Sequence, residues 1–146
     1  MKRKEFIYQC GGACAGGGVL VSWLQGCTAQ KGVTATLENK KLVIPLSSFY
    51  TEKDGEKKWS RIAIVRHERS AFPIAVYRFN ENDYKAFLLR CTHQGNELNV
   101  YGDLITCSAH GSEFNNTGEV VRGPAENKLQ SYPVTADNQN VYIQFL

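Results

Sequence analysis

The sequence predicts an all-β fold, an antiparallel β sandwich into which a smaller lobe is inserted. From Val33 onward, short segments rich in β-branched and aromatic residues alternate with polar turns. No ten-residue stretch of this region has the apolar repeat that an amphipathic helix requires. With 146 residues, the chain is long enough for one domain with a hydrophobic core, but not comfortably for two.

The expected strands follow one another along the chain, with a turn after most of them. They cover residues 33–37, 41–46, 61–67, 72–79, 84–90, 129–135 and 141–145. Glu38-Asn39-Lys40 forms the first hairpin turn, and the polar stretch 47–60 contains an Asp54-Gly55 turn. Residues 103–106 lead into a loop that contains Cys107. In the last strand, apolar residues at 141, 143 and 145 alternate with Tyr142 and Gln144, which predicts one buried face.

Residues 1–26 are typical of an export signal and not of a folded domain. Basic residues at positions 2–4 precede a weakly apolar stretch rich in Gly and Ala. The segment Arg3-Lys4-Glu5-Phe6-Ile7 resembles a twin-arginine signal with lysine in place of the second arginine. Leu24-Gln25-Gly26-Cys27 resembles a lipobox, which implies a lipid on Cys27, a tether over residues 27–32 and a domain over residues 33–146.

Two other interpretations of this segment stay open. The 21 residues from 6 to 26 are long enough to cross a bilayer as an uncleaved anchor. Six glycines together with Gln9, Ser22 and Gln25 make that span a poor one. A cleaved signal of another kind is the third interpretation. All three place the domain on the periplasmic side of a bacterial cytoplasmic membrane.

Charge and cysteine content narrow the classes of partner and of disulfide that the sequence allows. The formal net charge is +3, but without residues 1–26 there remain 14 basic and 13 acidic residues, scattered along the chain. This balance gives no reason to expect nucleic acid as a partner. Of five cysteines, Cys10 and Cys14 lie in the expected signal and Cys27 in the lipobox. The domain keeps Cys91 and Cys107, which leaves no spare thiol for an internal disulfide if both bind a metal.

Two short segments each place one cysteine close to one histidine. They read Cys91-Thr92-His93-Gln94-Gly95 and Cys107-Ser108-Ala109-His110-Gly111-Ser112, with thirteen residues between His93 and Cys107. A zinc finger supplies two cysteines first and two histidines later. Here each segment supplies one of each, which suits two metal atoms, one bound by both cysteines and the other by both histidines. This is the ligand set of a [2Fe–2S] centre in which two histidines replace two cysteines. A structural zinc site and a domain without metal are the alternatives.

The residues that follow strengthen the iron–sulfur interpretation. His110-Gly111-Ser112-Glu113-Phe114, Thr117-Gly118-Glu119-Val120 and Gly123-Pro124-Ala125 resemble the H-G-S-x-F, T-G-x-V and G-P-A sequences of the Rieske family. The match runs from about residue 90 to residue 132. It implies a Rieske-type sandwich with a cluster-binding lobe over about residues 90–124. It also implies one [2Fe–2S] cluster bound by Cys91, His93, Cys107 and His110. Around the cluster it places Gly95, Gly111, Ser112, Phe114, Gly123 and Pro124, with Ser112 as a hydrogen-bond donor and Pro124 in a covering loop.

Three positions depart from the quinol-oxidising members of the family. Those members join the two cluster loops by a disulfide, whose positions here hold Asn96 and Ala109. Their tyrosine near the cluster is Phe114 here, and their apolar leucine after the first histidine is Gln94. The resemblance therefore implies a low-to-intermediate reduction potential.

The expected function is one-electron transfer by a membrane-tethered periplasmic lipoprotein. Its partners would be redox proteins such as a cytochrome, a quinol-oxidising subunit or a metalloenzyme within a respiratory or other oxidoreductase complex. Two alternatives are the ferredoxin component of a Rieske-type oxygenase, which would need a cytoplasmic location, and a redox-inert binding or assembly module. No catalytic residue or substrate site is expected in the chain itself.

Overall fold

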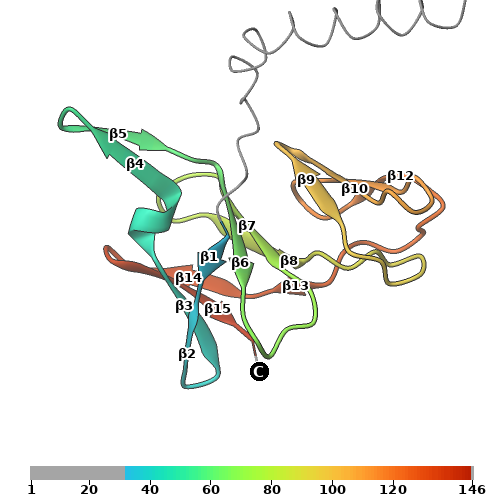
Figure 1. Cartoon of the computed structure of the whole chain (residues 1–146), viewed down its shortest axis with the longest axis horizontal. Coiled ribbons are helices and arrows are strands. Elements are labelled where there is room, and N and C mark those ends of the chain that lie inside the picture. The colour runs from blue at the N-terminus through green and yellow to red at the C-terminus, as the bar shows by residue number, and fades with distance from the viewer. Residues whose placement is uncertain (1–31, 146) are drawn as a thin grey trace, which may run out of the picture. The chain divides into compact units, whose positions relative to one another are not determined.

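The computed structural model describes residues 32–145 (Figure 1). The expected export signal, the lipobox with Cys27 and most of the expected tether lie outside these residues. The described region is nearly all β, which confirms the expected fold class. Within it, no helix is long and apolar enough to cross a membrane.

The strands are short and one 3₁₀ turn interrupts them. In chain order they are β1 (Val33–Thr34), β2 (Thr36–Glu38), β3 (Lys41–Pro45), the 3₁₀ helix η3 (Leu46–Phe49), β4 (Tyr50–Lys53), β5 (Glu56–Trp59), β6 (Ile62–Arg66), β7 (Ile74–Arg78), β8 (Tyr84–Leu88), β9 (Asn99–Tyr101), β10 (Leu104–Thr106), β11 (Glu113–Asn115), β12 (Val120–Arg122), β13 (Ser131–Tyr132), β14 (Val134–Ala136) and β15 (Asn140–Gln144).

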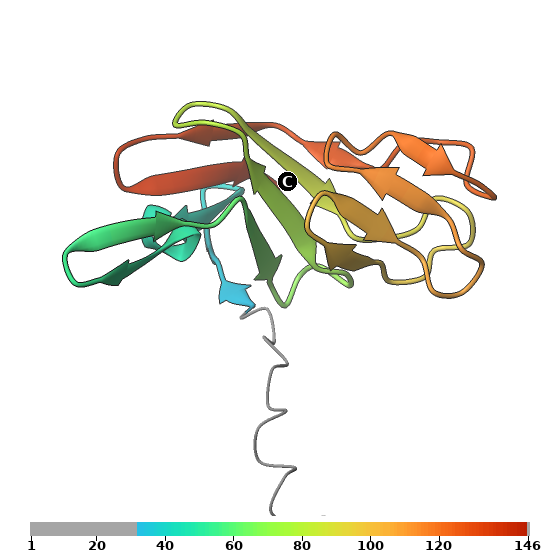
Figure 2. The ribbon, with the colours of Figure 1, turned by 90° about the horizontal axis from the view of Figure 1, so that it is seen from above.

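These strands form three sheets and one separate hairpin. A five-stranded sheet has the order β1-β6-β7-β8-β13, and a four-stranded sheet has the order β14-β15-β3-β2. Strands β12-β11-β10-β9 form a third sheet. This sheet, together with residues 90–98 and 107–129, is here called the cluster lobe. Among the described strands every pairing is antiparallel except β1 with β6. In Figure 2 the lobe, in yellow and orange, and the green β4–β5 hairpin extend in opposite directions.

Strand β7 contributes to two hydrophobic cores at once. Successive side chains of a strand point to opposite faces. Ile74 and Val76 therefore pack with β3 and β15, in the core of the sandwich. Ala75 and Tyr77 pack with residues of the cluster lobe in a second core, which also contains Phe87 of β8. This two-sided burial explains why residues 72–77 form a continuous apolar run.

Outside the cluster lobe, the structure differs from the expected strands in three places. The expected strand 33–37 is divided at Ala35, since β1 pairs with β6 and β2 pairs with β3. The polar stretch 47–60 folds into η3 and the β4–β5 hairpin, whose two-residue loop Asp54-Gly55 has positive φ angles of 54° and 81°. Such angles are those of a tight hairpin turn. The expected strand 129–135 is divided at Pro133, since β13 pairs with β8 and β14 pairs with β15. Proline has no N–H to donate, so the chain changes sheets there.

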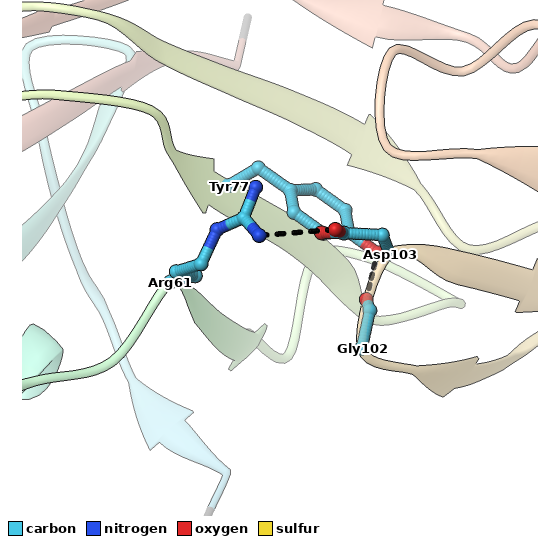
Figure 3. A network of polar contacts seen from close by, with 4 residues as sticks. All are labelled: Arg61, Tyr77, Gly102 and Asp103. Carbon is cyan, nitrogen blue, oxygen red and sulfur yellow. Dashed lines mark hydrogen bonds and ion pairs between the residues drawn. The ribbon is translucent and has the colours of Figure 1, made fainter.

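One buried tyrosine links the cluster lobe to the five-stranded sheet by a hydrogen bond. The hydroxyl of Tyr77 donates a 2.9 Å hydrogen bond to the carbonyl of Gly102, in the turn between β9 and β10 (Figure 3). Beside it, Arg61 and Asp103 form an ion pair of 3.0 Å. Burial raises the pKa of Tyr77 well above its ordinary value, and the negative charge of Asp103 raises it further. The hydroxyl thus stays protonated and keeps its donor role.

Candidate metal centre

The first of the two Cys–His segments, here called loop 1 (residues 91–96), is a tight turn after β8. The N–H of Gly95 donates to the carbonyl of Cys91 at 2.8 Å, and the N–H of Cys91 donates to the carbonyl of Asn96 at 2.8 Å. Gly95 has a φ of +78°, a conformation that favours glycine. An isolated bridge between Arg90 and Glu97 closes the base of the loop.

The second segment, here called loop 2 (residues 107–112), repeats the same turn between β10 and β11. The N–H of Gly111 donates to the carbonyl of Cys107 at 2.9 Å, and the N–H of Cys107 donates to the carbonyl of Ser112 at 2.8 Å. Gly111 also has a φ of +78°. The two loops therefore share one backbone hydrogen-bond pattern, although their histidines occupy different positions in it.

This repeated turn separates the thiols from the imidazoles. Cys91 and Cys107 are each 2% exposed, are not in a disulfide and belong to the second hydrophobic core. His93 and His110 are exposed, and their ring centroids lie 5.1 Å apart with perpendicular planes. The fold thus buries both cysteines in one core and brings the two histidines together at the surface.

Ser112, the last residue of loop 2, and Phe114, two residues further on, are both buried. Ser112 is fully buried, and its Oγ accepts a 3.0 Å hydrogen bond from the N–H of Ala125. Within the described residues this hydroxyl donates a hydrogen bond to no protein group, so it is available to donate one to an acceptor beside loop 2. Phe114 is fully buried in the same core as both cysteines and has no hydroxyl to offer.

The expected covering loop joins both Cys–His loops. A cis peptide bond links Gly123 to Pro124, and both residues are exposed. Ala125, the next residue, is buried against Ser112. Further along, the carbonyl of Asn127 accepts a 2.6 Å hydrogen bond from the hydroxyl of Thr92 in loop 1. A cavity of about 430 Å³ lies beside loop 1 and includes His93 and Asn127 in its lining.

Sequence reasoning did not identify several contacts that shape the lobe. The side-chain oxygen of Asn115 accepts hydrogen bonds from the N–H and the hydroxyl of Thr117 and from the N–H of Glu119. An asparagine two residues before a Thr-Gly pair is a recognisable turn signal. Gly118 lies against the ring of Phe87, and that contact leaves no local signal because the two residues are far apart in sequence. The hydrogen bond from Thr92 to Asn127 is equally invisible in the sequence.

The donor set fits a two-iron cluster. Two buried sulfur atoms and two exposed imidazoles are soft and borderline ligands, which suit iron–sulfur clusters and zinc. No three His, Cys, Asp or Glu side chains within residues 32–145 gather as a single-ion site. A [2Fe–2S] centre of mixed ligation needs only two protein ligands on each iron. The buried hydroxyl of Ser112 adds a hydrogen-bond donor that suits a sulfide of such a cluster.

The fold and these loops define a protein that carries a [2Fe–2S] cluster of mixed cysteine and histidine ligation. The family model described as the Rieske [2Fe-2S] domain matches residues 51–133, more than half of the chain. The chain therefore belongs to the Rieske [2Fe–2S] family. It carries one cluster of the Rieske type, and its function is electron transfer.

Solved structures share this fold. A chain of a hyperthermophilic respiratory Complex III is 18% identical with a TM-score of 0.51, and the match covers 94% of this chain and 98% of that one. A chain of naphthalene 1,2-dioxygenase with indole bound is 22% identical with a TM-score of 0.52. That match covers 72% of this chain but only 26% of the dioxygenase chain. At these identities the likeness supports the fold alone.

A third structure is the plasma membrane Rieske protein PetC3 of the cyanobacterium Synechocystis PCC 6803. It is 27% identical with a TM-score of 0.49, and the match covers 57% of this chain and 85% of that one. A search of curated proteins gives no match.

Proposed function

We propose that this chain is an exported, membrane-tethered carrier that passes single electrons to or within a respiratory or other oxidoreductase complex. The observation that carries the proposal is that His93 and His110 are exposed and adjacent while Cys91 and Cys107, from the same two loops, are buried. We assign these four residues as the ligands of the cluster. The bound cluster supplies a reversible one-electron acceptor. The chain supplies the ligands and the surface that a partner protein contacts.

The arrangement gives the two kinds of ligand, cysteine and histidine, separate tasks. The buried cysteines would hold one iron of the cluster in an apolar core that excludes water. The exposed imidazoles would hold the other iron near the surface, where a partner protein can approach closely. The hydroxyl of Ser112 would donate a hydrogen bond to a sulfur atom of the bound cluster, which would stabilise the reduced, more negative state.

The surroundings support a low-to-intermediate reduction potential. Histidine ligation raises the potential of Rieske centres above that of plant-type ferredoxins. Phe114 offers no second hydroxyl donor, and Asn96 and Ala109 provide no disulfide between the loops. Gln94, next to His93 in the sequence, is exposed. Its amide stands where quinol-oxidising members have an apolar leucine that contacts quinol. These residues favour a protein partner over direct oxidation of quinol.

The proposed location rests on the first 27 residues of the sequence. A twin-arginine-like signal suits a protein that receives its cluster before export, and a lipid on Cys27 would tether it to the membrane. Fractionation of cells that produce the full chain tests this. We expect the wild type in the membrane fraction and Cys27→Ser among soluble periplasmic proteins. A cytoplasmic wild type, or a mature protein that retains Met1, would refute the lipoprotein proposal.

A ferredoxin that serves an oxygenase is the second candidate. It is favoured by one observation, that both cysteines of the described region are free and no disulfide joins the loops. The two candidates differ in where the protein acts and in what it reduces. The reduced full chain, mixed anaerobically with a c-type cytochrome, should be reoxidised in a second-order reaction if it is a periplasmic carrier. A reduced chain that does not react with the cytochrome contradicts that role.

A further inference from the structure

The two loops of the site have no covalent connection. Cys91 and Cys107 are the only cysteines in residues 32–145, and neither forms a disulfide. Each loop is closed by its own backbone hydrogen bonds, which hold one turn but do not link it to the other. Something else must keep the loops in register if both are to hold one cluster.

One segment contacts both loops. Residues 123–129, here called the strap, accept a hydrogen bond from the loop 1 hydroxyl of Thr92 at the carbonyl of Asn127, 2.6 Å away. Two residues earlier, the N–H of Ala125 donates to the loop 2 hydroxyl of Ser112 at 3.0 Å. The two contacts are thus joined by a very short piece of backbone.

The strap is itself fixed to the core. Ala125 and Leu129 are 4% and 2% exposed and belong to the same core as both cysteines. The N–H of Leu129 donates to the carbonyl of Gly118 at 2.9 Å. Because the buried side chains of Ala125 and Leu129 hold it at two points, the strap stays in contact with both loops.

We propose that the strap couples the two ligand loops and takes the place of the missing disulfide, with Thr92 and Ser112 as its two hydroxyl anchors. A disulfide acts largely by restricting the unfolded chain, whereas these hydrogen bonds restrict only the native state. The loops of this protein therefore open together and reversibly. Thr92 is a positioning residue, since its hydroxyl contacts the strap. The proposal rests on the assignment of the two loops as ligand loops.

The test compares two threonine hydroxyls of the same lobe. Thr92→Val removes the 2.6 Å bond to the strap, and Thr117→Val removes a 2.7 Å bond to Asn115 that links no loops. Both threonines are partly buried. Loss of one hydrogen bond changes an opening equilibrium about fivefold. We expect Thr92→Val to lose its cluster to a chelator about fivefold faster than the wild type, with Thr117→Val and Thr92→Ser unchanged.

A second readout follows loop 2, where no residue is changed. Hydrogen exchange of the full chain, read by mass spectrometry on the peptide with Gly111, should become faster in Thr92→Val and stay unchanged in Thr117→Val. Faster exchange confined to loop 1, or an equal effect of Thr117→Val, would overturn the proposal. If Thr92→Val does not take up a cluster, hydrogen exchange of the wild type alone tests the coupling of the two loops. Coupled loops give the peptides with Gly95 and Gly111 similar protection, and independent loops give them different protection. No electron-transfer assay enters these readouts, so the proposed function can fail without affecting them.

Discussion

The imidazole rings of His93 and His110 lie 5.1 Å apart with perpendicular planes, although they come from different loops. His93 is the second residue after its cysteine and His110 is the third after its own. Because both loops form the same turn, this offset presents the two rings differently to the surface. Two exposed rings so close together are the outer half of the proposed ligand set.

Removal of either imidazole should prevent stable binding of the cluster. In His93→Ala, one iron loses a protein ligand, so we expect loss of the visible absorption and of nearly all iron and labile sulfide. Gln94→Ala changes the exposed neighbour of His93 and should keep a full cluster. Iron and sulfide analysis of both purified variants provides the measurement. A full cluster in His93→Ala would show that this ligand assignment is wrong.

The hydroxyl of Ser112 should raise the reduction potential. A hydrogen bond worth about 1 kcal/mol between redox states corresponds to about 40 mV for one electron. We therefore expect Ser112→Ala to lower the midpoint potential by about 40 mV. Phe114→Tyr adds a hydroxyl in the same core and should raise the midpoint by a similar amount. Redox titration of the purified domain measures both shifts, and a higher midpoint in Ser112→Ala would contradict the donor role.

Gly118 is required by packing as well as by its backbone angle. A Cβ at this position would lie 2.6 Å from a ring carbon of Phe87, and φ is +80°. Gly55 has nearly the same φ, +81°, with no atom within 4 Å of its Cβ position. Gly55→Ala should cost about 1 kcal/mol for the backbone angle alone, and Gly118→Ala about 2–4 kcal/mol with the added overlap. Thermal unfolding followed by circular dichroism compares them. Equal losses would mean that Phe87 moves aside freely.

The Tyr77 hydroxyl should stabilise the attachment of the lobe below about pH 10. Tyr77→Phe leaves the carbonyl of Gly102 without its donor, which should cost about 1 kcal/mol. The pKa of Tyr77 is raised by burial, so the unfolded chain ionises first as pH rises past the ordinary value of 10.0. The contribution of Tyr77 is therefore complete below pH 10 and is lost above it. Unfolding midpoints at pH 8 and pH 11 should show wild type and Tyr77→Phe converging. A gap that widens with pH would contradict this.

Strand positions followed from the sequence wherever turns and apolar alternation were clear. The Asn39-Lys40 turn and the alternating last strand are examples, and both are present in the structure. The β4–β5 hairpin was not predicted as strands because most of its side chains are exposed on both faces. Its shape depends on the Asp54-Gly55 turn and on the contact between Tyr50 and Trp59, whose ring centroids are 4.9 Å apart.

The sequence predicts the residues of the candidate site, but not the contacts that hold its loops in place. Cys91, His93, Cys107 and His110 stand in short motifs whose chemistry can be read directly. The backbone carbonyl of Asn127, which accepts from Thr92, belongs to a residue whose side chain takes no part. Such a contact leaves no mark on the sequence, so only the folded chain shows how the loops are joined.

The most direct test of the electron-carrier account is an anaerobic reductive titration of the purified full chain. The account predicts that each chain takes up one electron reversibly, with two irons present and a midpoint below that of quinol-oxidising Rieske proteins. A chain that takes up no electron, as a zinc protein or a redox-inert module would, contradicts it.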